Sequence, residues 1–148
     1  MMPYKRFESE LTVRPDDIDM NNHVHNSRYL DYYLSARYDQ MDRCYGLSME
    51  KLIEHGWTWY IKSCQIEFKR PLKLGERVVV RTWLESFQRT DVLVRFYIIK
   101  KETGKIAAEG SVINTMINIA SGRPQEIPDW VIAQYTQFLE EEGPEATA

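Results

Sequence analysis

The sequence predicts an α+β domain in which an antiparallel sheet curls around one long helix. Three observations lead to this prediction. A helical pattern of apolar residues follows a single short strand pattern near the N-terminus. Four long strand patterns, broken by turns, come after it. Antiparallel strands of this length twist strongly, so we expect the sheet to wrap around the helix.

The first element is a strand. Residues 7–14 alternate apolar and polar side chains, which is the pattern of a half-buried strand. Pro15 ends this strand, because proline has no N–H to donate to a neighbouring strand. A polar loop follows, and we expect a turn in it at residues 20–22.

The long helix comes next. Asn26 is a good N-cap for a helix that runs to about Tyr45 and is about 28 Å long, enough to cross a sheet. Apolar side chains at intervals of three and four residues predict the face that packs on the sheet. This stripe consists of Leu30, Leu34, Tyr38, Met41 and Tyr45, with Tyr33 beside it. Gly46 stops the helix, and Ser48 is expected to cap a short second helix that ends at Gly56.

Strands make up most of the remaining chain. A C-terminal helix is predicted from Pro128, in its first turn, to Leu139. The predicted strands span residues 57–70, 76–87, 91–101 and 105–120, with turns at 73–75 and 102–104. The middle of strand 91–101 is nearly all apolar, as expected for a central strand buried on both sides. We expect one domain over residues 1–148, with a frayed acidic tail from Glu140.

Composition and charge exclude several classes of protein. The 148 residues are 43% hydrophobic and 28% charged, as in an ordinary globular domain. The net charge of −3 predicts neither a nucleic-acid partner nor a membrane surface partner. No apolar run approaches the ~18 residues of a membrane span. Two cysteines, Cys44 and Cys64, form no CxxC pair, so we expect a reduced cytoplasmic protein.

The polar side chains that could do chemistry are concentrated at residues 16–26, directly before the long helix. This stretch holds three carboxylates, two imidazoles and three carboxamides. The first N–H groups of a helix are unpaired and carry the positive end of its dipole, so they can receive a developing negative charge. His23-x-His25 matches no zinc pattern with a second ligand pair, and we predict no metal. The sequence also lacks a G-x-S-x-G elbow and a P-loop.

The polar stretch also resembles a known family. Its pattern is Asp17-x-Asp19-x-x-x-His23-Val24-x-Asn26-x-x-Tyr29-Leu30, followed by Ala36-Arg37. This pattern resembles the signature of hotdog-fold acyl thioesterases of the 4-hydroxybenzoyl-CoA thioesterase-like branch. Residues 19–26 are also similar to acyl-ACP thioesterases, and residues 66–76 resemble the second-strand signature of the same superfamily. The resemblance covers about residues 8–120 and implies the hotdog fold, a sheet wrapped around a long central helix.

The resemblance implies a thioesterase acting on acyl-CoA, or on acyl-ACP, without a cofactor. It implies Asp19 as nucleophile or general base, with Asn21 and His23 orienting the water or holding Asp19. Backbone N–H groups around Asn26 and Ser27 would hold the oxyanion. Partial desolvation is expected to raise the basicity of Asp19. A homodimer or dimer of dimers with sites at the interface is implied too, and open sheet edges favour such pairing.

Two departures and two alternatives accompany this interpretation. Asn22 stands where many members have glycine, and Pro71 stands near the place of a glutamate in the acyl-ACP enzymes, which favours acyl-CoA. One alternative is a hotdog hydratase or dehydratase, for which Asp31 is the helix carboxylate available. The other is a non-catalytic acyl-binding protein.

The other two carboxylates of the polar stretch are not expected to act in catalysis. Asp17 is expected to be structural, bonding loop amides, and Asp16 is expected to be solvated.

Overall fold

The computed structural model describes residues 4–139, and the predicted acidic tail lies outside them. The strands pair antiparallel in one sheet of order β1-β3-β4-β5-β2, with β6 on β5. In chain order the elements are β1 (Phe7–Thr12), the 3-10 turn η1 (Pro15–Asp17), α1 (Arg28–Arg43), α2 (Met49–Glu54), β2 (Trp57–Phe68), β3 (Arg77–Gln88), β4 (Asp91–Lys100), β5 (Ile106–Asn118), β6 (Arg123–Pro124) and α3 (Asp129–Thr136).

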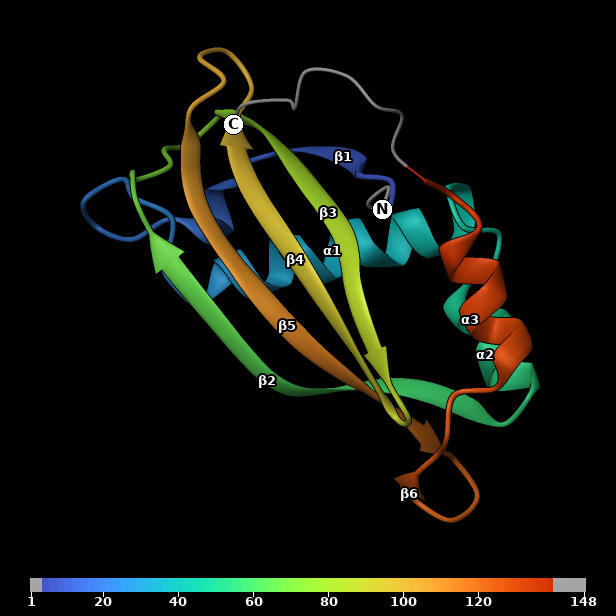
Figure 1. Ribbon diagram of the computed structural model, residues 1–148. Helices are drawn as coiled ribbons and strands as arrows, with labels where there is room; N and C mark the ends of the chain where they lie inside the picture. Colours follow the sequence, from blue (N-terminus) through green and yellow to red (C-terminus); the bar gives the residue numbers. More distant parts are fainter. Residues whose placement is uncertain (1–3, 140–148) are drawn as a thin grey trace.

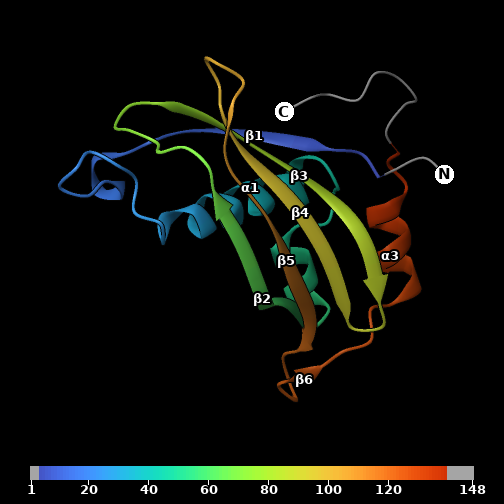
Figure 2. The same ribbon diagram turned by 60° about the vertical axis from the view of Figure 1, so that its left-hand side comes forward.

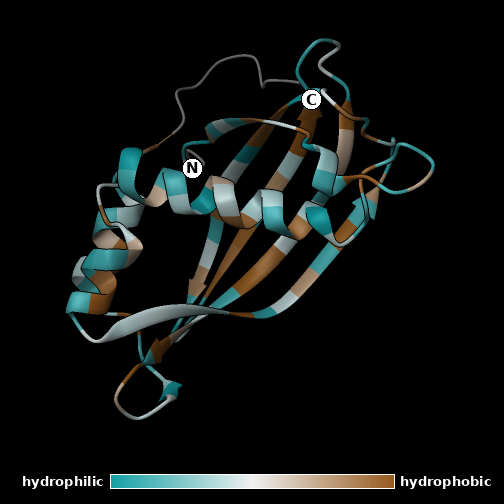
Figure 3. Cartoon of the chain, turned by 180° about the vertical axis from the view of Figure 1, so that it is seen from behind, coloured by the Kyte–Doolittle hydropathy of each residue, from teal (hydrophilic) through white to brown (hydrophobic). Residues whose placement is uncertain are grey.

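The sheet curls around α1, as the sequence predicts (Figures 1 and 2). Register shifts at Ile61/Ser63 in β2 and at Leu84/Ser86 in β3 mark irregularities in the long strands, and such bulges increase strand bending. From behind, α1 lies in front of the strands, which carry alternating hydrophobic and hydrophilic bands (Figure 3). The predicted hotdog architecture is therefore confirmed.

Most predicted element bounds agree with the structure to within a few residues. Ser48 caps α2 by accepting a hydrogen bond from the Lys51 N–H at 3.2 Å. Gly75 and Gly104 adopt positive φ values of 81° and 74° in the predicted turns. The predictions omit η1 and β6, and Pro128 is the N-cap of α3 rather than part of its first turn.

The predicted packing face of α1 is partly wrong. Leu34 and Tyr38, two members of the expected stripe, are 42% and 51% exposed. The buried residues of the helix are Tyr29, Tyr32, Tyr33, Ala36, Gln40 and Met41. These residues also recur at intervals of three and four, so two apolar stripes overlap on this helix and periodicity alone does not separate them.

A polar network fixes α1 against the sheet. The buried Gln40 side chain donates hydrogen bonds to Ser9 Oγ at 3.0 Å and to the Val80 carbonyl oxygen at 3.4 Å. The hydroxyl of Thr82 donates to the Gln40 side-chain oxygen. The helix is therefore tied to both β1 and β3, and its buried amide is satisfied.

The prediction that strand 91–101 is buried on both sides is wrong. Burial alternates along β4: Val94 and Phe96 are fully buried, whereas Arg95 between them is exposed. β4 is central in the sheet, but within the described chain no helix covers its outer face. An antiparallel sheet tolerates this arrangement, because one of its faces can remain solvated.

Candidate active site

The loop before α1 forms a small closed turn. Ile18 and Val24 make an antiparallel bridge at its base. Inside it, the Asp19 N–H donates to the His23 carbonyl oxygen at 2.8 Å, and the Asn22 N–H donates to the Asp19 carbonyl oxygen at 3.1 Å. The turn predicted at residues 20–22 is thereby confirmed, and it holds Asp19 and His23 opposite each other.

Asn22 can replace the glycine that many family members have at this position. Its φ is 57°, in the left-handed region that favours glycine and that asparagine tolerates better than other residues. The side-chain oxygen of Asn22 also accepts a hydrogen bond from the Leu74 N–H at 3.4 Å. The substitution therefore keeps the backbone conformation and adds a contact to the turn before β3.

The Asp19 carboxylate is held by backbone donors. Its Oδ1 accepts hydrogen bonds from the Asn21 N–H at 2.8 Å and from the His23 N–H at 3.1 Å. The hydrogen bond from the His23 backbone lowers the pKa of Asp19, and the Asn21 backbone contributes in the same direction. The expectation that desolvation raises its basicity is wrong, because the backbone donors outweigh the small burial of this carboxylate.

Three of the four predicted site residues line one hollow beside the end of β2. Asp19, His23 and Asn26 face it from the loop, and Tyr29 from the first turn of α1. The opposite wall is formed by Phe68, Lys69, Arg70 and Pro71, with His25 and Val24 completing the lining. Asn21 is not part of this lining, and its described contact to the site is its backbone N–H.

The helix begins differently from the prediction. Ser27, rather than Asn26, is the N-cap of α1, and its side chain makes no capping hydrogen bond. A turn precedes the helix, in which the Arg28 N–H donates to the His25 carbonyl oxygen at 2.9 Å, so backbone groups replace a side-chain cap. Within residues 4–139 the N–H groups of Asn26 and Ser27 donate to no other group. They are free to bind a ligand oxygen.

Asp17 has a structural role in the loop, as predicted. It is 6% exposed, and its Oδ2 accepts hydrogen bonds from the Tyr32 hydroxyl at 2.8 Å and the Arg14 N–H at 3.0 Å. Asp16 is exposed and forms an ion pair with Arg14 at 3.2 Å. The two neighbouring carboxylates thus have the structural and solvated roles expected of them.

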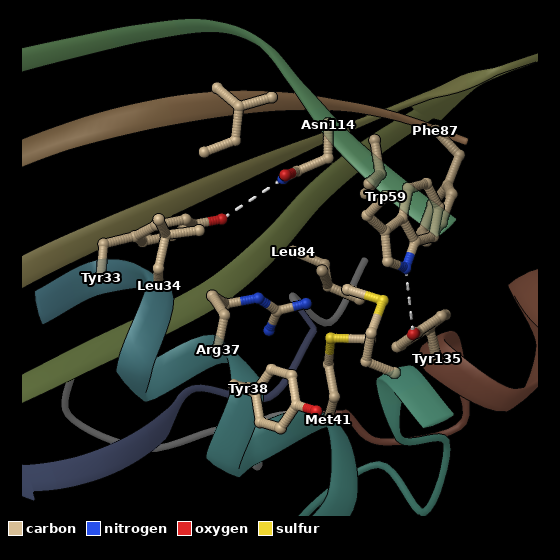
Figure 4. A pocket seen from close by; sticks show the side chains of 13 residues that line it. Tyr33, Leu34, Arg37, Tyr38, Met41, Trp59, Leu84, Phe87, Asn114 and Tyr135 are labelled. Carbon is tan, nitrogen blue, oxygen red and sulfur yellow. Dashed lines mark hydrogen bonds between the residues drawn. The ribbon is translucent and has the colours of Figure 1, made fainter. Parts of the chain in front are cut away.

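Sequence reasoning did not locate a second feature, an apolar cavity of about 130 Å³ (Figure 4). It lies between α1 and strands β2–β5, with Met49 of α2 and Tyr135 of α3 also in its lining. Its lining residues are mostly apolar: Tyr33, Leu34, Arg37, Tyr38, Met41, Met49, Trp59, Ile61, Leu84, Phe87, Val92, Asn114 and Tyr135. The available signal was the spacing of Arg37, which lies four residues after Tyr33 and four before Met41, so that helical periodicity places it beside two buried residues.

A curled antiparallel sheet around a long helix, with a loop carboxylate before the helix N-terminus, defines a hotdog-fold protein. The family model described as the thioesterase-like superfamily matches residues 13–135. The chain belongs to this superfamily, and the predicted resemblance is confirmed.

Individual relatives are distant but cover most of the chain. The long-chain acyl-CoA thioesterase FadM of Escherichia coli is 20% identical over 76% of this chain and 83% of its own. The chloroplastic acyl-acyl carrier protein thioesterase ATL2 of Arabidopsis thaliana is 25% identical over 88% of this chain and 69% of its own. A DHNA-CoA thioesterase structure from Staphylococcus aureus has a TM-score of 0.81 at 21% identity, covering 89% of both chains.

Two further observations concern the described residues. None of the helices within residues 4–139 is long and apolar enough to cross a membrane. Across the same residues, no three His, Cys, Asp or Glu side chains lie close enough together to hold a metal ion.

Proposed function

We propose that this protein hydrolyses an acyl-CoA thioester to the free acid and CoA. One observation carries the proposal: Asp19 and Asn26 line the same hollow, and the free N–H groups of Asn26 and Ser27 lie at the start of α1. Hydrolysis of a thioester needs a base or nucleophile together with donors for the developing oxyanion. Both kinds of group are present at this place, and the family membership supports the same reaction.

Hydrolysis can follow either of two routes. In the first, Asp19 is the general base: its carboxylate takes a proton from water, and the water oxygen bonds to the thioester carbon. With Asp19 as nucleophile, its carboxylate oxygen bonds to that carbon, and water later cleaves the anhydride. In both routes the N–H groups of Asn26 and Ser27 stabilise the oxyanion, the C–S bond breaks, and the thiolate leaves and takes up a proton.

The surrounding residues have supporting roles. The backbone N–H groups of Asn21 and His23 orient the carboxylate, and the His23 side chain faces the hollow, where it can position water. Lys69 and Arg70 line the opposite wall and provide positive charge for the phosphates of CoA. The apolar cavity beside α1 would receive the acyl group.

A homodimer, or a dimer of such dimers, is part of the proposal. β2 is an edge strand, and most of the side chains in its second half are exposed. An open edge of this length is a ready template for pairing with another strand. The hollow lies at the end of β2, so pairing there would place the site at the interface. The free thiols of Cys44 and Cys64 suit a cytoplasmic location.

The alternative hydratase has less support. Asp31 is exposed and its Oδ2 lies 3.5 Å from Arg28 Nη1, and this carboxylate does not line the hollow. A panel of acyl-CoA and acyl-ACP thioesters, assayed by release of free thiol, tests the proposal. We expect turnover of acyl-CoA above that of acyl-ACP. Tight acyl-CoA binding without thiol release, or water addition to an enoyl-CoA instead, would overturn it.

A further inference from the structure

Arg37 introduces a cation into the apolar cavity. It lies on α1, and its guanidinium is directed toward the space between Tyr33, Leu84 and Met41 (Figure 4). Its Nη1 is buried and makes no hydrogen bond to any group in residues 4–139. The guanidinium carbon lies 5.4 Å from the centre of the Tyr45 ring, a contact that leaves the N–H donors of Nη1 unused.

The described residues provide no anion for this cation. The cavity lining contains no Asp or Glu, and none of the ion pairs within residues 4–139 involves Arg37. Arginine stays charged in proteins, so the side chain does not avoid the cost of burial by losing its proton. A buried charge without a counter-ion is costly, and a bound anion would offset that cost.

Two further polar groups lie beside Arg37 in the cavity. Asn114 Nδ2 donates a hydrogen bond to the Tyr33 hydroxyl oxygen at 3.3 Å. Burial raises the pKa of Tyr33, so the phenol keeps its proton at neutral pH. Within the described chain this hydroxyl donates to no acceptor, so its proton is available to a ligand. An oxygen ligand between Tyr33 and Arg37 could therefore accept from both.

The dimensions suit the far end of an acyl group. The cavity of about 130 Å³ is similar in size to one that holds a benzene molecule, about 150 Å³. Tyr29, which lines the Asp19 hollow, and Arg37 are two turns apart on α1, which is about 12 Å along the axis.

We propose that this cavity selects acyl groups whose far end carries a carboxylate, which pairs with Arg37. The substrates would be CoA monothioesters of dicarboxylic acids. The inference rests on the proposed thioesterase function. A guanidinium can bind a carboxylate through two parallel hydrogen bonds, and a site built in this way rejects the analogue without the acceptor.

Matched substrates test the proposal. Adipoyl-CoA and hexanoyl-CoA, and likewise suberoyl-CoA and octanoyl-CoA, have acyl chains of equal length and differ in the terminal carboxylate. For the wild-type protein we expect kcat/KM to favour the dicarboxylic thioester by at least ~10²-fold. Arg37→Met should reduce this preference to less than about tenfold or invert it. Arg37→Lys should keep part of it, because lysine retains the charge but not the planar fork.

Arg81→Met is the matched control. Arg81 Nη1 is also buried without a hydrogen bond, but the Nε of this guanidinium pairs with Glu8 at 2.7 Å, and the residue lies on β3 outside the cavity lining. Its substitution should leave the substrate preference unchanged. Circular dichroism of each variant establishes that it is folded. A wild-type preference for the neutral thioester, or equal effects of Arg37→Met and Arg81→Met, would overturn the inference.

A binding measurement separates this inference from the proposed reaction. Non-hydrolysable thioether analogues of the same pairs can be titrated by calorimetry into the Asp19→Asn protein and into Asp19→Asn combined with Arg37→Met. The inference requires tighter binding of the carboxylate analogue that depends on Arg37, whether or not any thioester is hydrolysed. If Arg37→Met changes only the oligomeric mass, a second copy of the chain supplies the anion and the inference is wrong.

Discussion

Asp19 and His23 are joined by two hydrogen bonds that run in opposite directions. The Asp19 N–H donates to the His23 carbonyl oxygen at 2.8 Å, and the His23 N–H donates to Asp19 Oδ1 at 3.1 Å. The orientation of the carboxylate therefore depends on the backbone of residue 23. The His23 imidazole takes part in neither of these two hydrogen bonds.

Replacement of Asp19 by asparagine tests its role as catalyst. Asp19→Asn keeps an acceptor oxygen for the two backbone donors but removes the negative charge. We expect kcat to fall by at least ~10²-fold, the scale of losing a general base. KM should change little, because the cavity is unaltered. Thiol-release kinetics measures both parameters.

Asp16→Asn serves as the control, since Asp16 is an exposed carboxylate of the same loop. Its turnover should equal that of the wild type. His23→Ala should cost less than Asp19→Asn, because the backbone of residue 23 still holds the carboxylate. Near wild-type turnover by folded Asp19→Asn protein would exclude this carboxylate as the catalyst.

The pH dependence of kcat/KM should reflect the lowered pKa of Asp19. The carboxylate is active when ionised, and its pKa lies below the ordinary 3.8, so activity due to its ionisation should persist down to that pH. The stability that this shift contributes is present above the ordinary pKa and is lost as pH falls through the lowered one. A pH–rate profile with a stability check after each incubation measures this. An acid limb near pH 6.5 would instead indicate a histidine.

The buried pair Tyr32–Asp17 should contribute to stability rather than catalysis. Tyr32→Phe removes one of the two short hydrogen bonds to Asp17 Oδ2 and should cost about 1 kcal/mol. Asp17→Ala leaves the Tyr32 hydroxyl and the Arg14 N–H unpaired and should cost about 1–3 kcal/mol. Urea unfolding of both single variants and the double variant gives the coupling energy. Additive effects would mean that the two side chains do not interact.

The edge strand β2 should mediate dimerisation. Light scattering at micromolar concentration should give at least twice the 17.5 kDa mass of one chain. Tyr60→Glu on β2, where Tyr60 is 64% exposed, should weaken the association by bringing like charges to the interface. Leu74→Glu, in the loop after β2 and 48% exposed, is the control and should leave the mass unchanged. A monomeric wild-type protein would refute the prediction.

Local signals in the sequence predicted the elements well because their causes are local. Ser48 accepts a hydrogen bond three residues ahead, and Gly75 and Gly104 occupy turns that need a positive φ. The polar stretch before the helix likewise predicted where Asp19 and His23 meet. Each of these features depends on residues only a few positions apart.

Features that depend on distant residues were not predictable. Burial of Tyr33 and exposure of Leu34 are set by the sheet that α1 crosses, which periodicity does not report. The cavity at Arg37 combines side chains from α1 and from strands far along the chain. The pKa of Asp19 depends on the placement of two backbone N–H groups, which the sequence pattern does not specify.

The strand order has a consequence for the course of folding. β3, β4 and β5 follow one another through short turns, whereas Thr12 pairs with Arg77 and Trp57 pairs with Asn118. Closing these long loops costs more entropy, so the β3–β4–β5 meander should form first and the two outer strands should join last. The ribosome synthesises β1 and β2 before β3 and β5, the strands with which they pair, so neither can enter the sheet until the later strands have been made. Destabilising the β2–β5 contact should therefore accelerate unfolding more than it slows folding.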